Sequence, residues 1–215
     1  MYDLFYLFAV ILCFLIYAVI KIYLVTKKYR LKKERNEKYR NEVPGRLYET
    51  TILLLIKNFF QKNSIFKNVF LKNNNGNVTE IDILAVHNTG IYVLECKNYF
   101  GSLEGSINDK LWYHTNKNGI KYDFLNPVKQ NEIHLAAAKK LLQRFDLPYY
   151  SIIIFSNKCK IPNITYKADN AYIIYQKELV SLIKYLTSQK HIYSNKVINK
   201  ISDIIKQENI INTPK

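Results

Sequence analysis

The chain has 215 residues, 48% of them hydrophobic, which suits one domain with a substantial core plus an appendage. Its formal net charge of +15 favours a polyanionic partner, either nucleic acid or an anionic membrane surface. The three cysteines, Cys13, Cys96 and Cys159, are far apart and form no CxxC pair, which argues against a zinc site or a disulfide framework and fits a reducing compartment.

The first element is an uncharged apolar run, "LFYLFAVILCFLIYAVI", over residues 4–20. Lys21 interrupts the run and "IYLV" continues it to Val25. A helix over Leu4–Val25 would cross a hydrocarbon core of about 30 Å, with the Lys21 side chain reaching towards the interface. No basic residue precedes the run and no small-residue cleavage site follows it, so we expect an uncleaved transmembrane anchor over residues 1–25 instead of a signal peptide.

A strongly basic stretch, "KKYRLKKERNEKYR", follows the apolar run. By the positive-inside rule, the rest of the chain is expected on the cytoplasmic side of the cell membrane. Residues 26–44 are interpreted as a juxtamembrane linker near anionic headgroups, with contact to DNA as the alternative. "EVPG" then breaks the helical pattern, which predicts that the main domain covers residues 45–215.

The main domain is expected to begin with a helix over Arg46–Gln61, because apolar residues recur there at helical spacing. Glu49 falls within this apolar stripe, where a carboxylate needs a partner or a favourable place in the first turn. Asn126 and Pro127 suit the start of a second, strong helix. The other expected elements are strands over 65–72, 78–87, 90–97, 149–156 and 171–175, short strands within 102–124, and helices over 126–145, 176–186 and 195–207. This order predicts an α/β fold with one central mixed sheet flanked by helices.

Strands 78–87 and 90–97 are predicted to form a hairpin through the bend "HNTG". Pairing across the bend places Asp82 opposite Glu95 and Glu80 opposite Lys97. Side chains alternate between the two faces of a strand, so this register collects all four charges at the open end of one face. The other face is almost wholly apolar. A slip by one residue would destroy the sorting, which favours this register.

Two facing carboxylates repel each other unless a positive charge lies between them. Asp82 and Glu95 are oxygen ligands of the kind that Mg²⁺ accepts, with waters and a substrate phosphate completing its coordination. Lys97 lies on the same face and could hold or help to deprotonate an attacking water. The alternative is a structural salt-bridge cluster at a solvent-exposed strand end.

An Asp, a strand-turn-strand gap and then Glu-x-Lys form the PD-(D/E)xK nuclease pattern. The sequence resembles the nuclease-related domain (NERD) family of this superfamily over roughly residues 44–157. The stretches that carry the resemblance are "GRLYE", "EIDILAV", "GIYVLECKNYFG", Trp112 and "NPVKQNEIHL". Two departures are Tyr48, where the family often has a second glycine, and Ile81, which replaces the Pro of the superfamily's name.

The resemblance implies a restriction-endonuclease-like core of the order αβββαβ, here preceded by one transmembrane helix, and a metal-dependent phosphodiesterase role. By matching motif, Asp82, Glu95 and Lys97 take the catalytic positions. Glu49 matches the acidic residue of the first helix, and Gln130 matches the glutamine of the "NP…Q" motif. The expected function is a membrane-anchored nuclease that hydrolyses DNA with Mg²⁺ or Mn²⁺. The alternative is a catalytically inactive, membrane-tethered module that binds nucleic acid or acts as a scaffold.

Three further residues receive an interpretation from the sequence. Gln130 and His134 are four apart on the expected helix and therefore share a face. We assign Gln130 to the site and interpret His134 as a satisfied neighbour of the apolar stripe, without a role of its own. Trp112 is expected in the core of a short hairpin.

Overall fold

The computed structural model describes residues 16, 17, 19–21, 23, 24, 26–28, 45–116, 118–162 and 169–213, without the side chains of residues 210 and 212. The chain divides into two units, Met1–Pro44 and Gly45–Lys215. The expected anchor, Leu4–Val25, lies largely outside the described residues; those of its residues that are described are helical and exposed. Within the described segments, no helix combines the length and the apolar character that a membrane crossing requires.

The larger unit begins with a helix over residues 45–56, which continues into the 3₁₀ turn η1 (Lys57–Phe59). A five-stranded sheet follows, in the order β1-β2-β3-β7-β9. Its first three strands, β1 (Ile65–Lys72), β2 (Val78–His87) and β3 (Gly90–Lys97), are antiparallel, and β7 (Tyr149–Phe155) and β9 (Ala171–Tyr175) run parallel to β3. The predicted α/β class and mixed central sheet are therefore confirmed.

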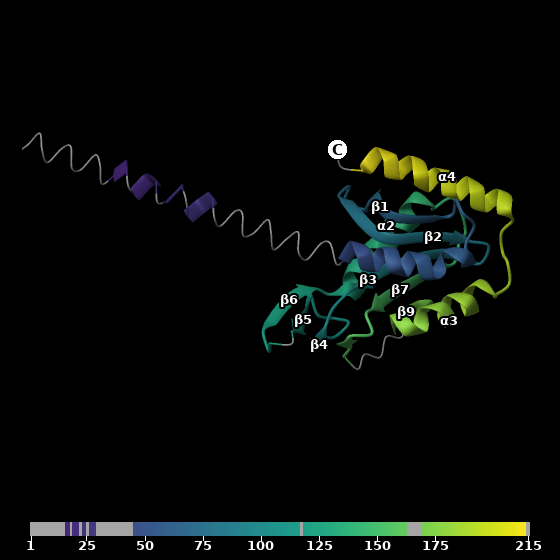
Figure 1. Cartoon of the computed structure of the whole chain (residues 1–215). Helices are drawn as coiled ribbons and strands as arrows, with labels where there is room; N and C mark the ends of the chain where they lie inside the picture. Colours follow the sequence, from purple (N-terminus) through teal and green to yellow (C-terminus); the bar gives the residue numbers. More distant parts are fainter. Residues whose placement is uncertain are drawn as a thin grey trace, which may run out of the picture. The chain divides into compact units, whose positions relative to one another are not determined.

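Helices cover both faces of this sheet (Figure 1). On one face, Ile52 and Ile56 of the 45–56 helix and Leu179 of α3 (Gln176–Thr187) pack in a core that includes Ile83. On the other face, α2 (Pro127–Leu141) and α4 (Asn195–Asn212) form a second core. Its buried members include Ala137, Ala138, Ile198, Ile201, Leu84 and Val86.

The structure has a second sheet, with the order β6-β5-β4-β8, in addition to the single central sheet that the sequence predicts. Its strands are β4 (Gly101–Glu104), β5 (Leu111–Thr115), β6 (Lys121–Leu125) and β8 (Cys159–Lys160). Trp112 of β5 is fully buried, as expected, and its ring stacks on Phe155 of β7 with centroids 6.1 Å apart. This packing fixes the small sheet against the central one.

The start of α2 agrees with the prediction, because the Asn126 side chain accepts a hydrogen bond from the Val128 N–H and Pro127 is the first helical residue. The Asn126 amide also donates to the carbonyl oxygens of Ser106, Ile107 and Asp109. The expected ends differ from the observed ones: the first helix stops five residues before Gln61, and α2 stops at Leu141. A tighter 3₁₀ turn terminates the first helix, and periodicity alone does not reveal such an ending.

We expect the change Trp112→Ala to lower the free energy of unfolding by about 3–5 kcal/mol, because it empties the contact with Phe155 and deletes a buried hydrogen bond to Ser106. Urea denaturation followed by far-UV circular dichroism measures this difference. Tyr113→Ala, at a half-exposed position on the same strand, is the matched control and should cost clearly less. Equal losses in the two variants would contradict the packing role of Trp112.

Candidate active site

The β2–β3 hairpin has the predicted register. Ile83 pairs with Leu94, and continuing this pairing by one residue sets Asp82 opposite Glu95. The bend leaves both residues at the open end of the hairpin, where the pairing of β2 with β3 stops. The hairpin therefore brings together the two carboxylates that the sequence singled out.

The alternation of faces breaks at Asp82, which sequence reasoning missed. Ile81 packs in the same core as Leu84, whereas Ile83 packs in the core on the opposite face. Across from Asp82 on β1, Asn68 adopts a positive φ of 54°, an uncommon conformation for a side chain larger than hydrogen. This local distortion interrupts the alternation of side chains between the two faces of the sheet at Asp82.

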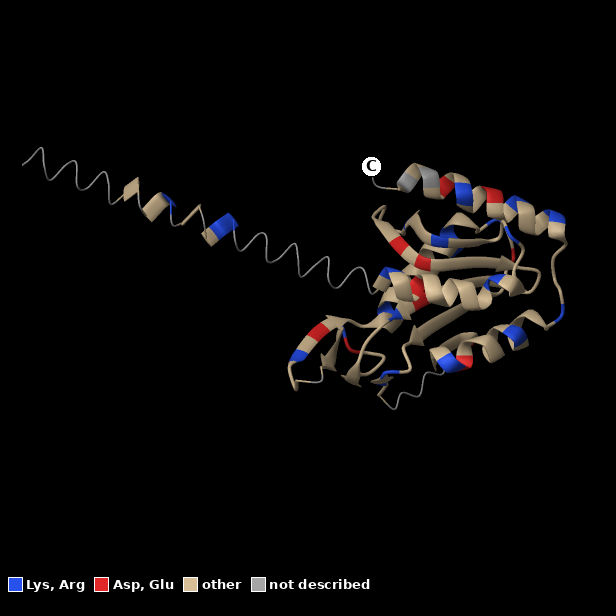
Figure 2. Ribbon diagram, in the orientation of Figure 1, with Lys and Arg blue, Asp and Glu red and all other residues tan. Residues whose placement is uncertain are grey.

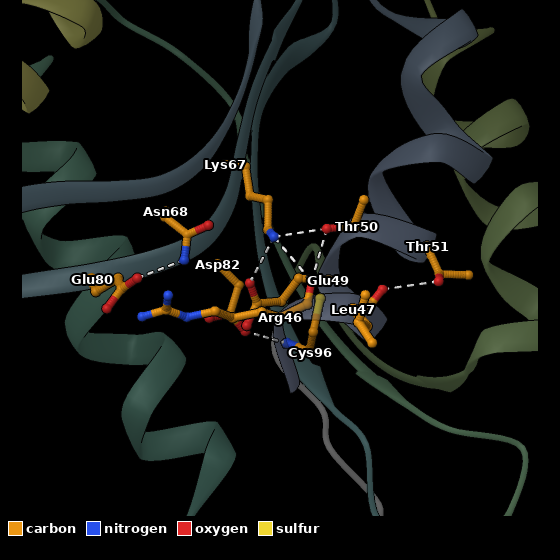
Figure 3. A network of polar contacts seen from close by, with 10 residues as sticks. All are labelled: Arg46, Leu47, Glu49, Thr50, Thr51, Lys67, Asn68, Glu80, Asp82 and Cys96. Atoms are coloured by element: carbon orange, nitrogen blue, oxygen red, sulfur yellow. Dashed lines mark hydrogen bonds and ion pairs between the residues drawn. The ribbon is translucent and has the colours of Figure 1, made fainter. Parts of the chain in front are cut away.

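The distortion separates Asp82 from Glu80. The Asp82 Oδ2 atom accepts a hydrogen bond of 2.7 Å from the backbone N–H of Cys96. Glu80 is exposed, and its Oε1 atom accepts a hydrogen bond of 2.6 Å from the Asn68 amide (Figure 3). The expectation that Glu80 joins the charge cluster is therefore wrong, because its carboxylate is held at the surface by Asn68.

Glu95 and Lys97 both point to the face that α2 covers. Glu95 is 1% exposed, and its Oε1 atom lies 2.6 Å from the Lys97 Nζ atom. Lys97 also donates a hydrogen bond of 2.8 Å to the Oε1 atom of Gln130 on α2. Gln130 thus reaches the site that the sequence assigned to it, through direct contact with Lys97.

His134 lies one helical turn after Gln130 and is also part of this cluster. It is buried, its Nδ1 atom lies 2.9 Å from the Thr79 hydroxyl, and its Nε2 atom lies 3.1 Å from Oε2 of Glu95. His134 therefore has polar partners, as expected for a satisfied neighbour of the apolar stripe, and one of these partners is the carboxylate of Glu95. Its four-residue spacing from Gln130 was the available signal, because both side chains had to face the same strands.

Glu49 enters the site from the 45–56 helix and contacts Lys67 of β1. The Lys67 Nζ atom lies 3.3 Å from Glu49 Oε2 and donates hydrogen bonds to the Thr50 hydroxyl at 2.8 Å and the Arg46 carbonyl at 3.0 Å. Figure 3 shows Glu49 and Asp82, from the helix and from β2, gathered near this ammonium group. Sequence reasoning missed Lys67, because this residue belongs to no motif and lies in the sequence simply as part of a predicted strand.

The two carboxylates respond differently to their surroundings. Burial, and next the neighbouring Glu95 carboxylate, raise the pKa of Asp82 well above its ordinary value. Burial would also raise the pKa of Glu95, but the Lys97 ammonium and His134 hold it below its ordinary value. Burial would lower the pKa of Lys97, but the Glu95 carboxylate raises it. Glu95 and Lys97 are therefore an ion pair, whereas Asp82 forms no ion pair with a described lysine or arginine and has a raised pKa chiefly because it is buried.

The donor set suits a hard divalent cation. Oε2 of Glu95 and Oε2 of Glu49 are buried, and each lies within ion-pair distance of one nitrogen, His134 Nε2 at 3.1 Å and Lys67 Nζ at 3.3 Å. Asp82 and Glu95 supply carboxylate oxygens, and Mg²⁺ commonly takes one or two carboxylates, with waters and substrate phosphate as its other ligands. In the described part of the chain, no group of three or more His, Cys, Asp or Glu residues is placed so that it could hold a metal ion. The fit to Mg²⁺ therefore rests on the two carboxylates of Asp82 and Glu95 alone.

We expect Asp82→Asn to raise the free energy of unfolding at pH 7 without added metal. The amide oxygen can still accept the Cys96 N–H, and the substitution removes the charge that Glu95 repels. A carboxyl group with a raised folded-state pKa destabilises the fold increasingly as pH rises above its unfolded value of about 3.9. The gain should therefore be larger at pH 7 than at pH 4.

Urea denaturation in EDTA at both pH values measures this gain. Glu80→Gln, an exposed change on the same strand, is the matched control, with an expected effect within about 0.5 kcal/mol. An Asp82→Asn variant that unfolds more readily than the parent at pH 7 would contradict the assignment of repulsion to this pair.

Comparison with known proteins places the domain in a family. Residues 44–156, more than half of the chain, match the family described as "Nuclease-related domain". The chain is also 29% identical over 150 residues to an uncharacterised protein of Bacillus anthracis, and the aligned part covers 68% of each protein. No solved structure matches the chain. The chain therefore belongs to the nuclease-related domain family, with which its assignment to the PD-(D/E)xK superfamily is consistent.

Proposed function

We propose that the protein is a metal-dependent nuclease that hydrolyses phosphodiester bonds of DNA. The observation that carries the proposal is the meeting of Asp82, Glu95 and Lys97 at the open end of one hairpin, with no described lysine or arginine in a direct ion pair with Asp82. Membership of the nuclease-related domain family supports the same reading. Strained charge of this kind is typical of functional sites.

The proposed cofactor is Mg²⁺ or Mn²⁺, held by the carboxylates of Asp82 and Glu95. When bound, such a cation supplies positive charge that polarises a phosphoryl oxygen and lowers the pKa of a bound water. The hydrogen bond from the Cys96 N–H orients the Asp82 carboxylate, and Lys97 orients that of Glu95. His134 lies against the other oxygen of Glu95, and the Thr79 hydroxyl in turn contacts His134, as outer partners of a ligand commonly do.

Lys97 is proposed to hold the attacking water or a phosphate oxygen. Because Glu95 raises the pKa of Lys97, the amine is protonated at neutral pH and acts as a hydrogen-bond donor and a positive charge. A fixed positive charge stabilises the negative charge that develops on the phosphate in the transition state. The Gln130 amide oxygen accepts one Lys97 hydrogen bond and so fixes the direction of the ammonium group.

The surface charge supports a polyanionic substrate. The whole chain has a formal net charge of +15. Figure 2 shows Lys and Arg residues distributed over α3, α4 and the central sheet, with Asp and Glu residues interspersed among them. A surface of this kind attracts the phosphate backbone without reading its sequence. We therefore propose DNA as the substrate and the backbone as the recognised feature.

The second candidate is a module that binds nucleic acid but does not cleave it. The Glu95–Lys97 ion pair is the observation in its favour, because an ion pair of this geometry also serves a purely structural role. The two candidates differ in one respect: only the nuclease requires the negative charge of Asp82, which no described lysine or arginine pairs with directly in an ion pair.

A plasmid-nicking assay with the full chain in detergent and an excess of Mg²⁺ tests the proposal. We expect Asp82→Asn and Lys97→Met each to reduce the nicking rate by about 10²-fold or more, because each removes a charge that acts on the transition state. Lys184→Met, on the distant helix α3, is the control and should retain the parent rate.

Nicking that EDTA abolishes and that depends on Asp82 and Lys97 supports the nuclease. Salt-sensitive DNA binding with no cleavage by the parent protein would favour the binding module. Cleavage that persists unchanged in both variants would show that another site or a contaminant is responsible.

We also propose that Leu4–Val25 anchors the protein in the cell membrane, with the nuclease domain on the cytoplasmic side. The support is the apolar run and the basic stretch after it. The full chain is then expected to remain in the membrane pellet after a wash with alkaline carbonate. A variant that lacks residues 1–44 should appear in the supernatant, and release of the full chain by the wash would contradict an anchor.

A further inference from the structure

We propose that Lys67 takes the place of a second divalent cation beside Glu49, so that the site binds a single metal ion. This inference rests on the proposed function, because it concerns the number of ions that the same site holds. It assigns Lys67 a positioning role: the ammonium holds the Glu49 carboxylate and keeps it from serving as a metal ligand.

The first argument is the place of the ammonium group. Two-metal sites hold their ions about 3.5–4 Å apart, clamped by carboxylates that lie close to one another. Figure 3 shows Glu49 and Asp82 both near the Lys67 ammonium group, so a second ion shared by these two carboxylates would have to take the position of that group. The Lys67 Nζ atom already lies 3.3 Å from Glu49 Oε2 (Figure 3).

The second argument is that the ammonium is fixed. A lysine ammonium has three N–H donors, and Lys67 has three acceptors within reach: Glu49, the Thr50 hydroxyl and the Arg46 carbonyl. All three belong to the first part of the 45–56 helix, whereas Lys67 lies on β1. An ion that displaced the ammonium would therefore have to break three contacts between two elements of the core.

The third argument is the contrast between the two sides of the site. Both Glu49 and Glu95 contact a lysine, but Glu95 is also flanked by His134 and lies opposite Asp82 in the hairpin register. A cation near Asp82 relieves the repulsion between Asp82 and Glu95. Near Glu49 the charge is already balanced by Lys67. The arrangement of charges therefore favours one ion beside Asp82 and disfavours a second ion beside Glu49.

Titration calorimetry of the full chain in detergent with MnCl₂ tests the inference. The parent protein should bind one Mn²⁺, whereas Lys67→Met should bind two, because Glu49 is then free to act as a ligand. Lys67→Gln is the second variant for the case that Met impairs folding, since its amide can still donate to Thr50 or Arg46. The electron paramagnetic resonance spectrum should change from that of an isolated Mn²⁺ to that of a coupled pair.

Three controls make the assignment specific. Lys67→Arg retains the positive charge and should still bind one ion. Lys72→Met removes an exposed lysine from the same strand and should also bind one ion. The double variant Lys67→Met, Glu49→Gln removes the proposed second ligand and should return the stoichiometry to one.

The outcomes separate this inference from the proposed function. Two ions in the parent protein, one ion in both Lys67→Met and Lys67→Gln, or two ions in the double variant would each overturn the role of Lys67 and leave a metal-dependent nuclease standing. A parent protein that binds no Mn²⁺ would instead overturn the metal dependence itself, and this inference with it.

Discussion

Repulsion between the carboxylates of Asp82 and Glu95 is the interaction on which the site depends. The hairpin register forces the two residues to face each other, and burial removes the water that would otherwise screen them. Of the two carboxylates, Glu95 is neutralised by an ion pair with Lys97. Asp82 receives a single backbone hydrogen bond from Cys96, which orients it without neutralising it. The Asp82 carboxylate is therefore the group whose negative charge a bound cation would neutralise.

The surrounding elements each contribute one contact to this centre. From α2, Gln130 directs Lys97 and His134 lies against Glu95. From the first helix and β1, Glu49 and Lys67 form a second ion pair beside Asp82. The first helix and α2 cover opposite faces of the sheet. The site lies at the open end of the β2–β3 hairpin, where side chains from both helices meet. Two cores must therefore pack correctly before the polar groups meet.

The sequence predicted the backbone plan and the residues whose spacing follows from it. Asp82, Glu95 and Lys97 could be found because hairpin register relates them directly, and Gln130 because its helix begins at a recognisable Asn-Pro cap. The break in alternation at Asp82 could not be predicted, since it depends on the positive φ of Asn68 on the neighbouring strand. Lys67 was missed for a related reason. Its partners on the first helix are set by tertiary packing between elements, which no local pattern encodes.

The position of the small sheet has a consequence for how the molecule can vary. After Lys97 the chain forms β4, β5 and β6 and then reaches Asn126. The Asn126 amide donates hydrogen bonds to three backbone carbonyls in the loop between β4 and β5. These hydrogen bonds and the packing of Trp112 on Phe155 hold the segment from β4 to β6 in place. The tip between β5 and β6 can consequently lengthen, shorten or acquire new side chains while Lys97 and Gln130 keep their 2.8 Å contact.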